Sequence, residues 1–331
     1  VRRGRGVQVP DLGQRVKRLG VIGTMVWDTV YRPHSTEPVE EWGGISYALA
    51  ALDVSLPDDW VLVPLIKVGR DLAPEANRFL STLDRRASNT RFIEVPEPNN
   101  RVTLHYLNEG RRTERLRGGV PGWRWPELGP MVQDLDAIYC NLISGFELDL
   151  ETAQLLRRGF GGPIYADLHS LTLGVADDGL RVPQPLTAID DWFSCFDAVQ
   201  VNEEELALIG GEPMAVAARA LANGVGLLIV TLADQGAVYF ADGDFAFVHP
   251  ERRERTEPTL RTARIPVIAA DDTRDPTGCG DVFGATVVSH LVQNTPLVDA
   301  ISAANHLAAR NAQYHGATNL QYHLRGQIVP R

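Results

Sequence analysis

Short apolar segments alternate with segments of helical periodicity along most of this chain, and this alternation restricts its fold more than any other feature. The apolar segments, such as residues 60–69 and 224–233, are continuous, as strands buried on both faces of a sheet are. The segments between them, such as residues 151–160 and 214–223, have helical spacing and are long enough to connect parallel strands. The pattern therefore predicts an α/β sandwich with a mostly parallel central sheet.

Two segments interrupt this alternation. One follows the first apolar segment, at about residues 30–43, and the other, at about residues 99–118, alternates polar with apolar side chains as a half-exposed antiparallel hairpin does. We expect both to form a small β-sheet lid outside the main layer. Because the chain has no internal repeat and no low-complexity tract, we interpret residues 19–325 as one domain that follows a basic extension at residues 1–18.

The size and charge of the chain limit its partners. Its 331 residues, 44% of them hydrophobic, can fill a sizeable core, and a net charge of -10 disfavours binding to nucleic acid. We interpret the basic extension as solvated, although contact with RNA or an acidic surface is an open alternative. Because we find neither a membrane-spanning apolar segment nor a hydrophobic signal region, we expect no membrane association and a cytoplasmic location. The three cysteines have no metal-ligand spacing and predict no disulfide framework.

The segment DPTGCGD, residues 275–281, leads into an apolar helix. Phe283, Val287 and Leu291 fall near one face of a helix that should begin close to Asp281. The first N–H groups of a helix lack partners and carry the positive end of its dipole, so the GCG turn offers donors to an anion. A tight turn with Asp281 as a capping acid is the simpler alternative. An acid beside an anion site is, however, what phosphoryl transfer needs if that acid takes the proton of an attacking hydroxyl.

DPTGCGD resembles the D-T-T-G-A-G-D signature of the ribokinase-like (pfkB) family of carbohydrate and nucleoside kinases, with Pro276 and Cys279 as departures. Other segments resemble the same family: VNEEEL its N-x-x-E motif, GGISYALAAL its early double-glycine segment, and LLIVTLADQGAVYF its nucleotide-side strand pair. GVIGTMVWD resembles its first strand, which ends in a substrate-binding aspartate, here Asp28. The resemblance extends over residues 19–318 and implies a three-layer α/β/α sandwich with a small β-sheet lid.

The resemblance implies phosphoryl transfer from ATP to a hydroxyl of a small polyhydroxylated compound, such as a sugar, a sugar acid, an inositol or a nucleoside. Asp281 would be the general base. The backbone N–H groups that would stabilise the transferring phosphoryl group belong to Gly278, Cys279 and Gly280. Asn202 and Glu205 would hold Mg²⁺, mainly through water, although taken alone they indicate only a helix cap.

On the donor side, Thr231 and Gly236 resemble the family's nucleotide-binding turn, although Ala233 stands where the family usually has glycine. Asn305 lies on a late helix that flanks the adenine in the family, and ordinary helix packing would explain it equally well. The resemblance also implies a monovalent cation such as K⁺ near the glycine-rich turn, where ADDTRD, residues 270–275, contains suitable oxygens.

On the acceptor side, the implied substrate-binding residues are Asp28, Gly43, Gly44 and His169. Two departures from the family make the substrate hard to name: Ala48 replaces an asparagine that often contacts the sugar, and His169 ends a segment that usually reads D-x-N. His169 is therefore either a substrate ligand or a locally hydrogen-bonded histidine. The expected hairpin carries arginines that could contact an acidic substrate or form a solvated face: Arg101, Arg111, Arg112, Arg115 and Arg117.

Lids of this family often pair between subunits, and an exposed sheet edge favours pairing, so we expect a homodimer. Two other classes of protein stay open. Cys279 at a helix start should have a lowered pKa and could serve as a nucleophile. A non-catalytic sugar- or nucleotide-binding regulator on the same fold is the other alternative.

Overall fold

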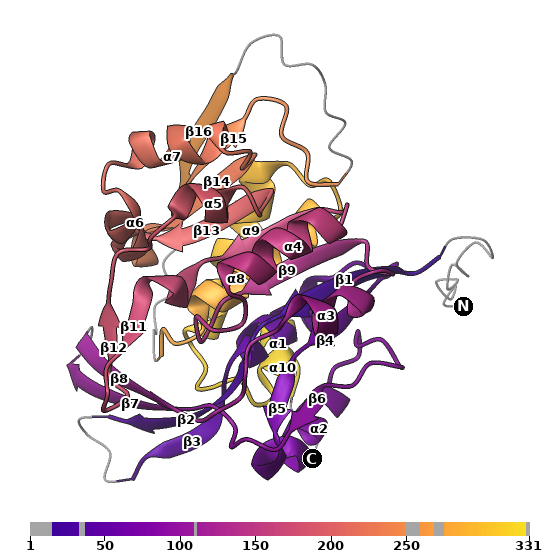
Figure 1. Cartoon of the computed structure of the whole chain (residues 1–331), viewed down its shortest axis with the longest axis vertical. Coiled ribbons are helices and arrows are strands. Elements are labelled where there is room, and N and C mark those ends of the chain that lie inside the picture. The colour runs from indigo at the N-terminus through magenta and orange to yellow at the C-terminus, as the bar shows by residue number, and fades with distance from the viewer. Residues whose placement is uncertain (1–14, 33–36, 109–110, 249–258, 268–274, 329–331) are drawn as a thin grey trace, which may run out of the picture.

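The computed structural model describes residues 15–32, 37–108, 111–248, 259–267 and 275–328. The main layer of this part of the chain is an eight-stranded sheet (Figure 1), in which every pair from β14 to β4 is parallel while β15 and β16 are antiparallel additions. The α/β class with a mostly parallel sheet is thus confirmed. The strand order is β16 (Leu260–Ile265), β15 (Ala237–Asp242), β14 (Leu227–Thr231), β13 (Ala198–Asn202), β10 (Ile164–Asp167), β9 (Ala137–Asn141), β1 (Lys17–Ile22) and β4 (Trp60–Leu65).

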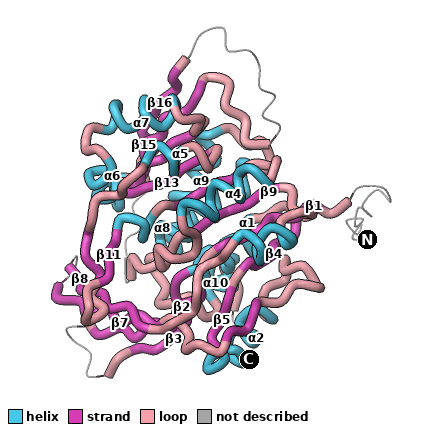
Figure 2. The backbone as a smooth tube through the Cα atoms, viewed as in Figure 1, coloured by secondary structure: helices cyan, strands magenta, loops and turns pink. Residues whose placement is uncertain are grey.

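Helices cover both faces of this sheet, and each face has its own hydrophobic core (Figures 1 and 2). One core is closed by α1 (Ile45–Ser55), α2 (Ala73–Ser81), α8 (Cys279–Leu291), α9 (Leu297–Asn311) and α10 (Leu320–Arg325). The other is closed by α3 (Trp125–Leu128), α4 (Leu150–Gly159), α5 (Ile189–Phe193), α6 (Glu203–Ile209) and α7 (Pro213–Ala222). The short elements between them are β5 (Lys67–Gly69), η1 (Arg70–Leu72), β6 (Ile93–Val95), η2 (Gly129–Met131), η3 (His169–Thr172), β11 (Leu173–Val175), β12 (Arg181–Pro183) and η4 (Ala233–Gln235).

The continuous apolar segments form strands because both of their faces are covered. In β9, Ile138 packs into one core while its neighbour Tyr139 packs into the other, and all five residues of the strand are buried. Burying a large apolar side chain stabilises the fold by about 1.5–3 kcal/mol, so a polar residue in such a strand is costly unless it is hydrogen-bonded. Asn141, Asp167 and Asn202 accordingly stand at the ends of their strands. Gln200, which lies within β13, is hydrogen-bonded.

A second sheet of four strands lies at one end of the main layer, in the order β3 (Val39–Gly44), β2 (Met25–Tyr31), β7 (Arg101–Asn108) and β8 (Arg111–Arg117) (Figure 2). We call it the lid sheet. One expectation was wrong: the apolar run does not form a single strand that ends in Asp28. It divides at Gly23 because Ile45 packs there, so close that an added Cβ would lie 2.5 Å from it. Asp28 consequently lies inside β2, in the lid sheet, rather than at the end of a core strand.

None of the helices in the described part of the chain combines the length and the apolar character that a membrane crossing requires.

Candidate active site

A cavity of about 800 Å³ lies between the lid sheet and the carboxyl ends of the central strands, where open α/β sheets bind ligands. Its walls come from the lid sheet, from the residues that follow β10, β13 and β14, and from α8 and α9. All the site residues proposed from the sequence line this one cavity except Gly43. Gly43 lies behind Asp28, so close that a Cβ on it would be 1.8 Å from the Asp28 carboxylate.

The glycine-rich turn forms the floor of the cavity; we call residues 276–280 the anion loop. Helix α8 begins at Cys279, two residues before the expected start, and Asp281 lies in its first turn. Gly278 has φ 77°, and a Cβ there would lie 2.2 Å from the Tyr47 ring, so both the backbone conformation and the space require glycine. The Cys279 N–H already donates to the Pro276 carbonyl at 3.2 Å.

Asn141 holds the candidate base, and the sequence analysis missed it. It ends the buried strand β9, is fully buried, and donates from Nδ2 to Oδ1 of Asp281 at 2.8 Å. Its own Oδ1 has no hydrogen-bond partner among the described residues. The sequence signal for Asn141 was a polar residue at the end of an apolar strand. Only the fold, however, brings Asn141 to Asp281, which is 140 positions away in the chain.

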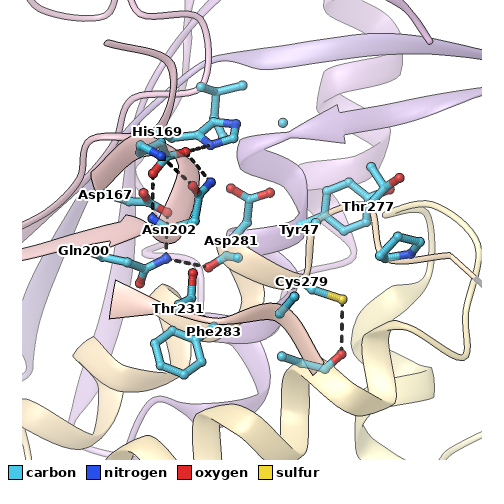
Figure 3. A pocket seen from close by; sticks show the side chains of 18 of the residues that line it. Tyr47, Asp167, His169, Gln200, Asn202, Thr231, Thr277, Cys279, Asp281 and Phe283 are labelled. Carbon is cyan, nitrogen blue, oxygen red and sulfur yellow. Dashed lines mark hydrogen bonds and ion pairs between the residues drawn. The ribbon is translucent and has the colours of Figure 1, made fainter. Parts of the chain in front are cut away.

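A hydrogen-bonded group of polar residues lies beside Asp281 (Figure 3). Glu205 accepts from the backbone N–H and the Nδ2 of Asn202, and Asn202 Oδ1 accepts from the Glu205 N–H, so the two residues form a capping box on α6. Gln200, which the sequence analysis also missed, donates to Asp167 Oδ2 at 2.9 Å and to the Gly280 carbonyl at 3.1 Å. Gln200 therefore ties the anion loop to β13.

His169 joins this group from the other side. Its Nδ1 lies 3.1 Å from Glu205 Oε1, and its φ of 24° is unusual for a residue other than glycine. Desolvation lowers the pKa of His169, but Glu205, Asp167 and Asp281 raise it further, to about 10, so the imidazole is charged at neutral pH. Burial is also the main cause that raises the pKa of Asp167. The site thus contains a fixed cation that the D-x-N pattern would not supply.

The end of the cavity that contains Thr231, Gly236 and Asn305, which we call the donor end, is lined by small residues, including Gly236, Ala308 and Ala312. Ala233 has φ 49°, so it adopts the left-handed conformation that glycine favours. Gly236 has φ 91°, and a Cβ there would lie 2.0 Å from the Ile265 carbonyl. Asn305 donates to that carbonyl at 3.0 Å while lining the cavity, so it also fastens α9 to β16.

The acceptor end combines an apolar lid wall with acidic side chains. Leu104 and Leu116 line it together with Asp28 and Glu114. Arg181, missed in the sequence, also lines it, with Nε 4.0 Å from Glu114 and Nη1 donating to the Ser144 carbonyl at 2.7 Å.

The hairpin arginines whose side chains are described do not line the cavity. Arg101 pairs with Asp71 and Arg115 pairs with Asp178, both on the outer surface, while Arg117 is exposed. The side chains of Arg111 and Arg112 lie outside the described residues, as do residues 1–14 of the basic extension and most of ADDTRD.

The alternative in which Cys279 serves as a nucleophile is not supported by its surroundings. Burial, together with the Asp275 and Asp281 charges, raises the pKa of Cys279 to about 11 instead of lowering it, despite a hydrogen bond from Asn311. Its Sγ donates to the Ala308 carbonyl at 3.4 Å. A thiol that is protonated at neutral pH is a poor nucleophile.

A metal ion would depend on water for most of its ligands here. Among the described residues no group of three or more His, Cys, Asp and Glu could hold a metal. Both oxygens of Glu205 already accept hydrogen bonds. This arrangement fits Mg²⁺, which keeps several waters and binds mainly through one or two carboxylates and the substrate phosphates.

Residues 171–323 match the family described as pfkB family carbohydrate kinase. No curated protein matches the sequence significantly.

Three solved structures show the same fold. A pyrophosphate-dependent kinase in the ribokinase family, complexed with a pyrophosphate analog and myo-inositol, superposes with a TM-score of 0.70 and 15% identity over 93% of this chain and 99% of that chain. A ribokinase from Arabidopsis thaliana, complexed with ribose and ATP, superposes with a TM-score of 0.68 and 16% identity, over 94% of this chain and 98% of that chain. A Burkholderia thailandensis nucleoside kinase in complex with inosine superposes with a TM-score of 0.67 and 16% identity, over 92% of this chain and 94% of that chain. These superpositions confirm the ribokinase-like fold.

Proposed function

We propose that this chain, whose residues 171–323 match the pfkB family of carbohydrate kinases and whose fold is ribokinase-like, transfers the γ-phosphoryl group of ATP to a hydroxyl of a small polyhydroxylated compound, with Asp281 as the general base. The observation that carries this proposal is the position of Asp281. It lies in the first turn of α8, next to the anion loop, and faces a cavity that reaches from the lid sheet to α9 (Figure 3).

The chemistry assigned to the chain follows from these positions. The Asp281 carboxylate takes the proton of the acceptor hydroxyl as its oxygen attacks phosphorus, a contribution of about 10²- to 10⁴-fold in rate. Backbone N–H groups of Gly278, Cys279 and Gly280 stabilise the negative charge of the group in transfer; the Cys279 N–H does so once it leaves its 3.2 Å bond to Pro276. Asn141 keeps the carboxylate aimed at the cavity.

On the donor side, we assign Thr231, Gly236 and Asn305 to the nucleotide, since they line the end of the cavity that small residues leave open. Mg²⁺, when bound, neutralises phosphate charge and orients the γ-phosphoryl group. Asn202 and Glu205 are the residues that would hold it, through water. His169 adds a positive charge to the same region.

On the acceptor side, we assign Asp28, Gly44 and His169 to substrate binding, with Gly43 giving Asp28 its space. Among the described side chains, the charge of Arg181 is balanced by Glu114, the charge of His169 is balanced by Glu205, and no hairpin arginine reaches the cavity. A neutral polyol, such as an inositol, a sugar or a nucleoside, therefore fits better than a sugar acid. The three related structures were determined with compounds of this kind.

The lid sheet has an edge strand, β3, and we assign the proposed homodimer to pairing along this edge. Size-exclusion chromatography with light scattering measures the assembly, and a monomer at micromolar concentration contradicts it. The cytoplasmic location stays a prediction.

The function is tested by incubating the protein with Mg-ATP, or with magnesium pyrophosphate, and a panel of inositols, sugars, nucleosides and sugar acids, while ADP or phosphate release is followed. We expect at least one neutral polyol to stimulate ADP release. If no compound stimulates release of ADP from ATP or of phosphate from pyrophosphate, kinase activity toward this class is refuted. If several compounds raise the melting temperature without ADP release, the protein is a binding regulator instead.

A further inference from the structure

A cluster of charged residues lies next to the anion loop but does not line the cavity. Arg32 and Glu41 come from the lid sheet and its continuation, whereas Asp275 and His315 come from the segments before α8 and after α9. They belong to parts of the chain more than 200 residues apart, since Arg32 and Asp275 are separated by 243 positions.

Asp275 is the centre of this cluster and supports the anion loop directly. It is 5% exposed, and its Oδ1 accepts the backbone N–H of Thr277 at 3.0 Å. Its own N–H donates to the Ala312 carbonyl at 3.0 Å. The conformation of the loop therefore depends on this carboxylate.

The other oxygen of Asp275 is taken by Arg32. Arg32 Nη2 donates to Asp275 Oδ2 at 2.5 Å, and Nδ1 of His315 lies 3.5 Å from the same oxygen. In ADDTRD, residues 270–275, the segment that could hold a monovalent cation, only Asp275 is described. Its Oδ2 is paired with Arg32. The residues present thus do not fit a K⁺ ion at this carboxylate.

A second acid lies in the same place. Glu41 on β3 accepts a backbone hydrogen bond from Thr318 and lies against Gly316, where a Cβ would be 1.6 Å from its carboxylate. Burial first, and then the Asp275 charge, raise the pKa of Glu41 to about 7, while Arg32 lowers it. Two acids beside a phosphate site disfavour the approach of further negative charge unless a cation compensates them.

We propose that Arg32 is a positioning residue whose guanidinium replaces a monovalent cation beside the anion loop, so that phosphoryl transfer by this chain needs no K⁺. The proposal rests on the kinase function proposed above. Arg32 follows β2, the strand that carries Asp28, and a second lid residue, Tyr106, hydrogen-bonds Thr277 at 2.7 Å. The residue that neutralises Asp275 is therefore attached to the strand that contacts the acceptor.

The test compares the unmodified protein with Arg32→Ala and Arg32→Lys. Each protein is first assayed in buffer whose only added cations are tetramethylammonium and Mg²⁺. The assay is then repeated with K⁺ or methylguanidinium in place of tetramethylammonium, at equal ionic strength. The matched control is Arg115→Ala, which removes a lid arginine that pairs with Asp178 and does not line the cavity. The acceptor is whichever compound the panel identifies, and ADP release is followed.

We expect the unmodified protein and Arg115→Ala to keep their kcat in all buffers. Arg32→Ala should lose roughly 10-fold or more in kcat without K⁺, because the loop is misplaced, and should regain it with K⁺ or methylguanidinium. Arg32→Lys should retain most of the activity. The proposal is overturned if the unmodified protein requires K⁺, or if Arg32→Ala keeps full activity without it.

A second readout needs no substrate and separates this proposal from the kinase assignment. Melting temperature is measured with K⁺ in place of tetramethylammonium. Folded Arg32→Ala should be stabilised by K⁺ while the unmodified protein and Arg115→Ala are not. Equal responses of all three overturn the cation role, whereas absence of ADP release with every acceptor refutes only the kinase function. If Arg32→Ala does not fold, Arg32→Lys and the K⁺ response of the unmodified protein still decide.

Discussion

The hydrogen bond between Asn141 and Asp281 leads to a quantitative expectation for the pH dependence of the reaction. Replacing Asn141 by Ala removes a donor at 2.8 Å from the Asp281 carboxylate, in a site where Asn141 is fully buried. A hydrogen bond to a charged group stabilises that charged form by about 1.5–3 kcal/mol. Since about 1.4 kcal/mol corresponds to one pKa unit, the apparent pKa of the acidic limb of kcat/KM should rise by about 1–2 units.

The assay is the rate of ADP release between pH 5 and 9 with the acceptor that the panel identifies. Asn99→Ala is the matched control, because Asn99 is also a fully buried asparagine but bonds only backbone groups outside the cavity. Both variants should lose stability, and only Asn141→Ala should move the acidic limb to higher pH. If that limb stays in place while kcat falls, or if Asn99→Ala moves it equally, Asn141 acts through packing and the reasoning is refuted.

Three further expectations follow from the site. Asp281→Asn should lower kcat by at least about 10²-fold with ATP affinity largely kept; an equal loss of ATP binding by calorimetry would make Asp281 a structural cap. The pKa of folded His169 lies near 10, above its usual 6.5, so its contribution to the free energy of unfolding is present below pH 6.5 and is lost as pH rises toward 10. In His169→Gln this decline, measured by urea unfolding between pH 6 and 10, should be smaller, and an unchanged decline would contradict the charged histidine. Ala233→Gly should raise the free energy of unfolding by about 1 kcal/mol, because Ala233 is held at φ 49°, and a destabilised variant would show that its methyl group packs favourably.

Part of this fold and site could be predicted from local pattern. Continuous apolar strands and helical spacing indicated a mostly parallel sheet because both signals arise between neighbours in the chain. The glycine-rich turn before an apolar helix indicated donors and an acid in its first turn, and α8 begins two residues before the expected position, with Gly278 as its cap. The division of the first apolar run into β1 and β2 escaped prediction, because it depends on Ile45 packing against Gly23.

The residues missed share one property: their partners are distant in sequence. No local motif marks Asn141, Gln200 or Arg181, and only the fold places them beside Asp281, Gly280 and Glu114, respectively. Cys279 shows the reverse error, since a helix start alone predicts a lowered thiol pKa, whereas burial and two nearby acids raise it.

The sequence by itself thus determined the kind of layers and the position of the glycine-rich turn, and it indicated the family, because these are carried by short-range periodicity and by contiguous motifs. Only the tertiary structure decided which charges meet: His169 with Glu205, Arg32 with Asp275 and Asn141 with Asp281. Electrostatic interactions depend on separation in space and on burial, and neither is set by separation along the chain.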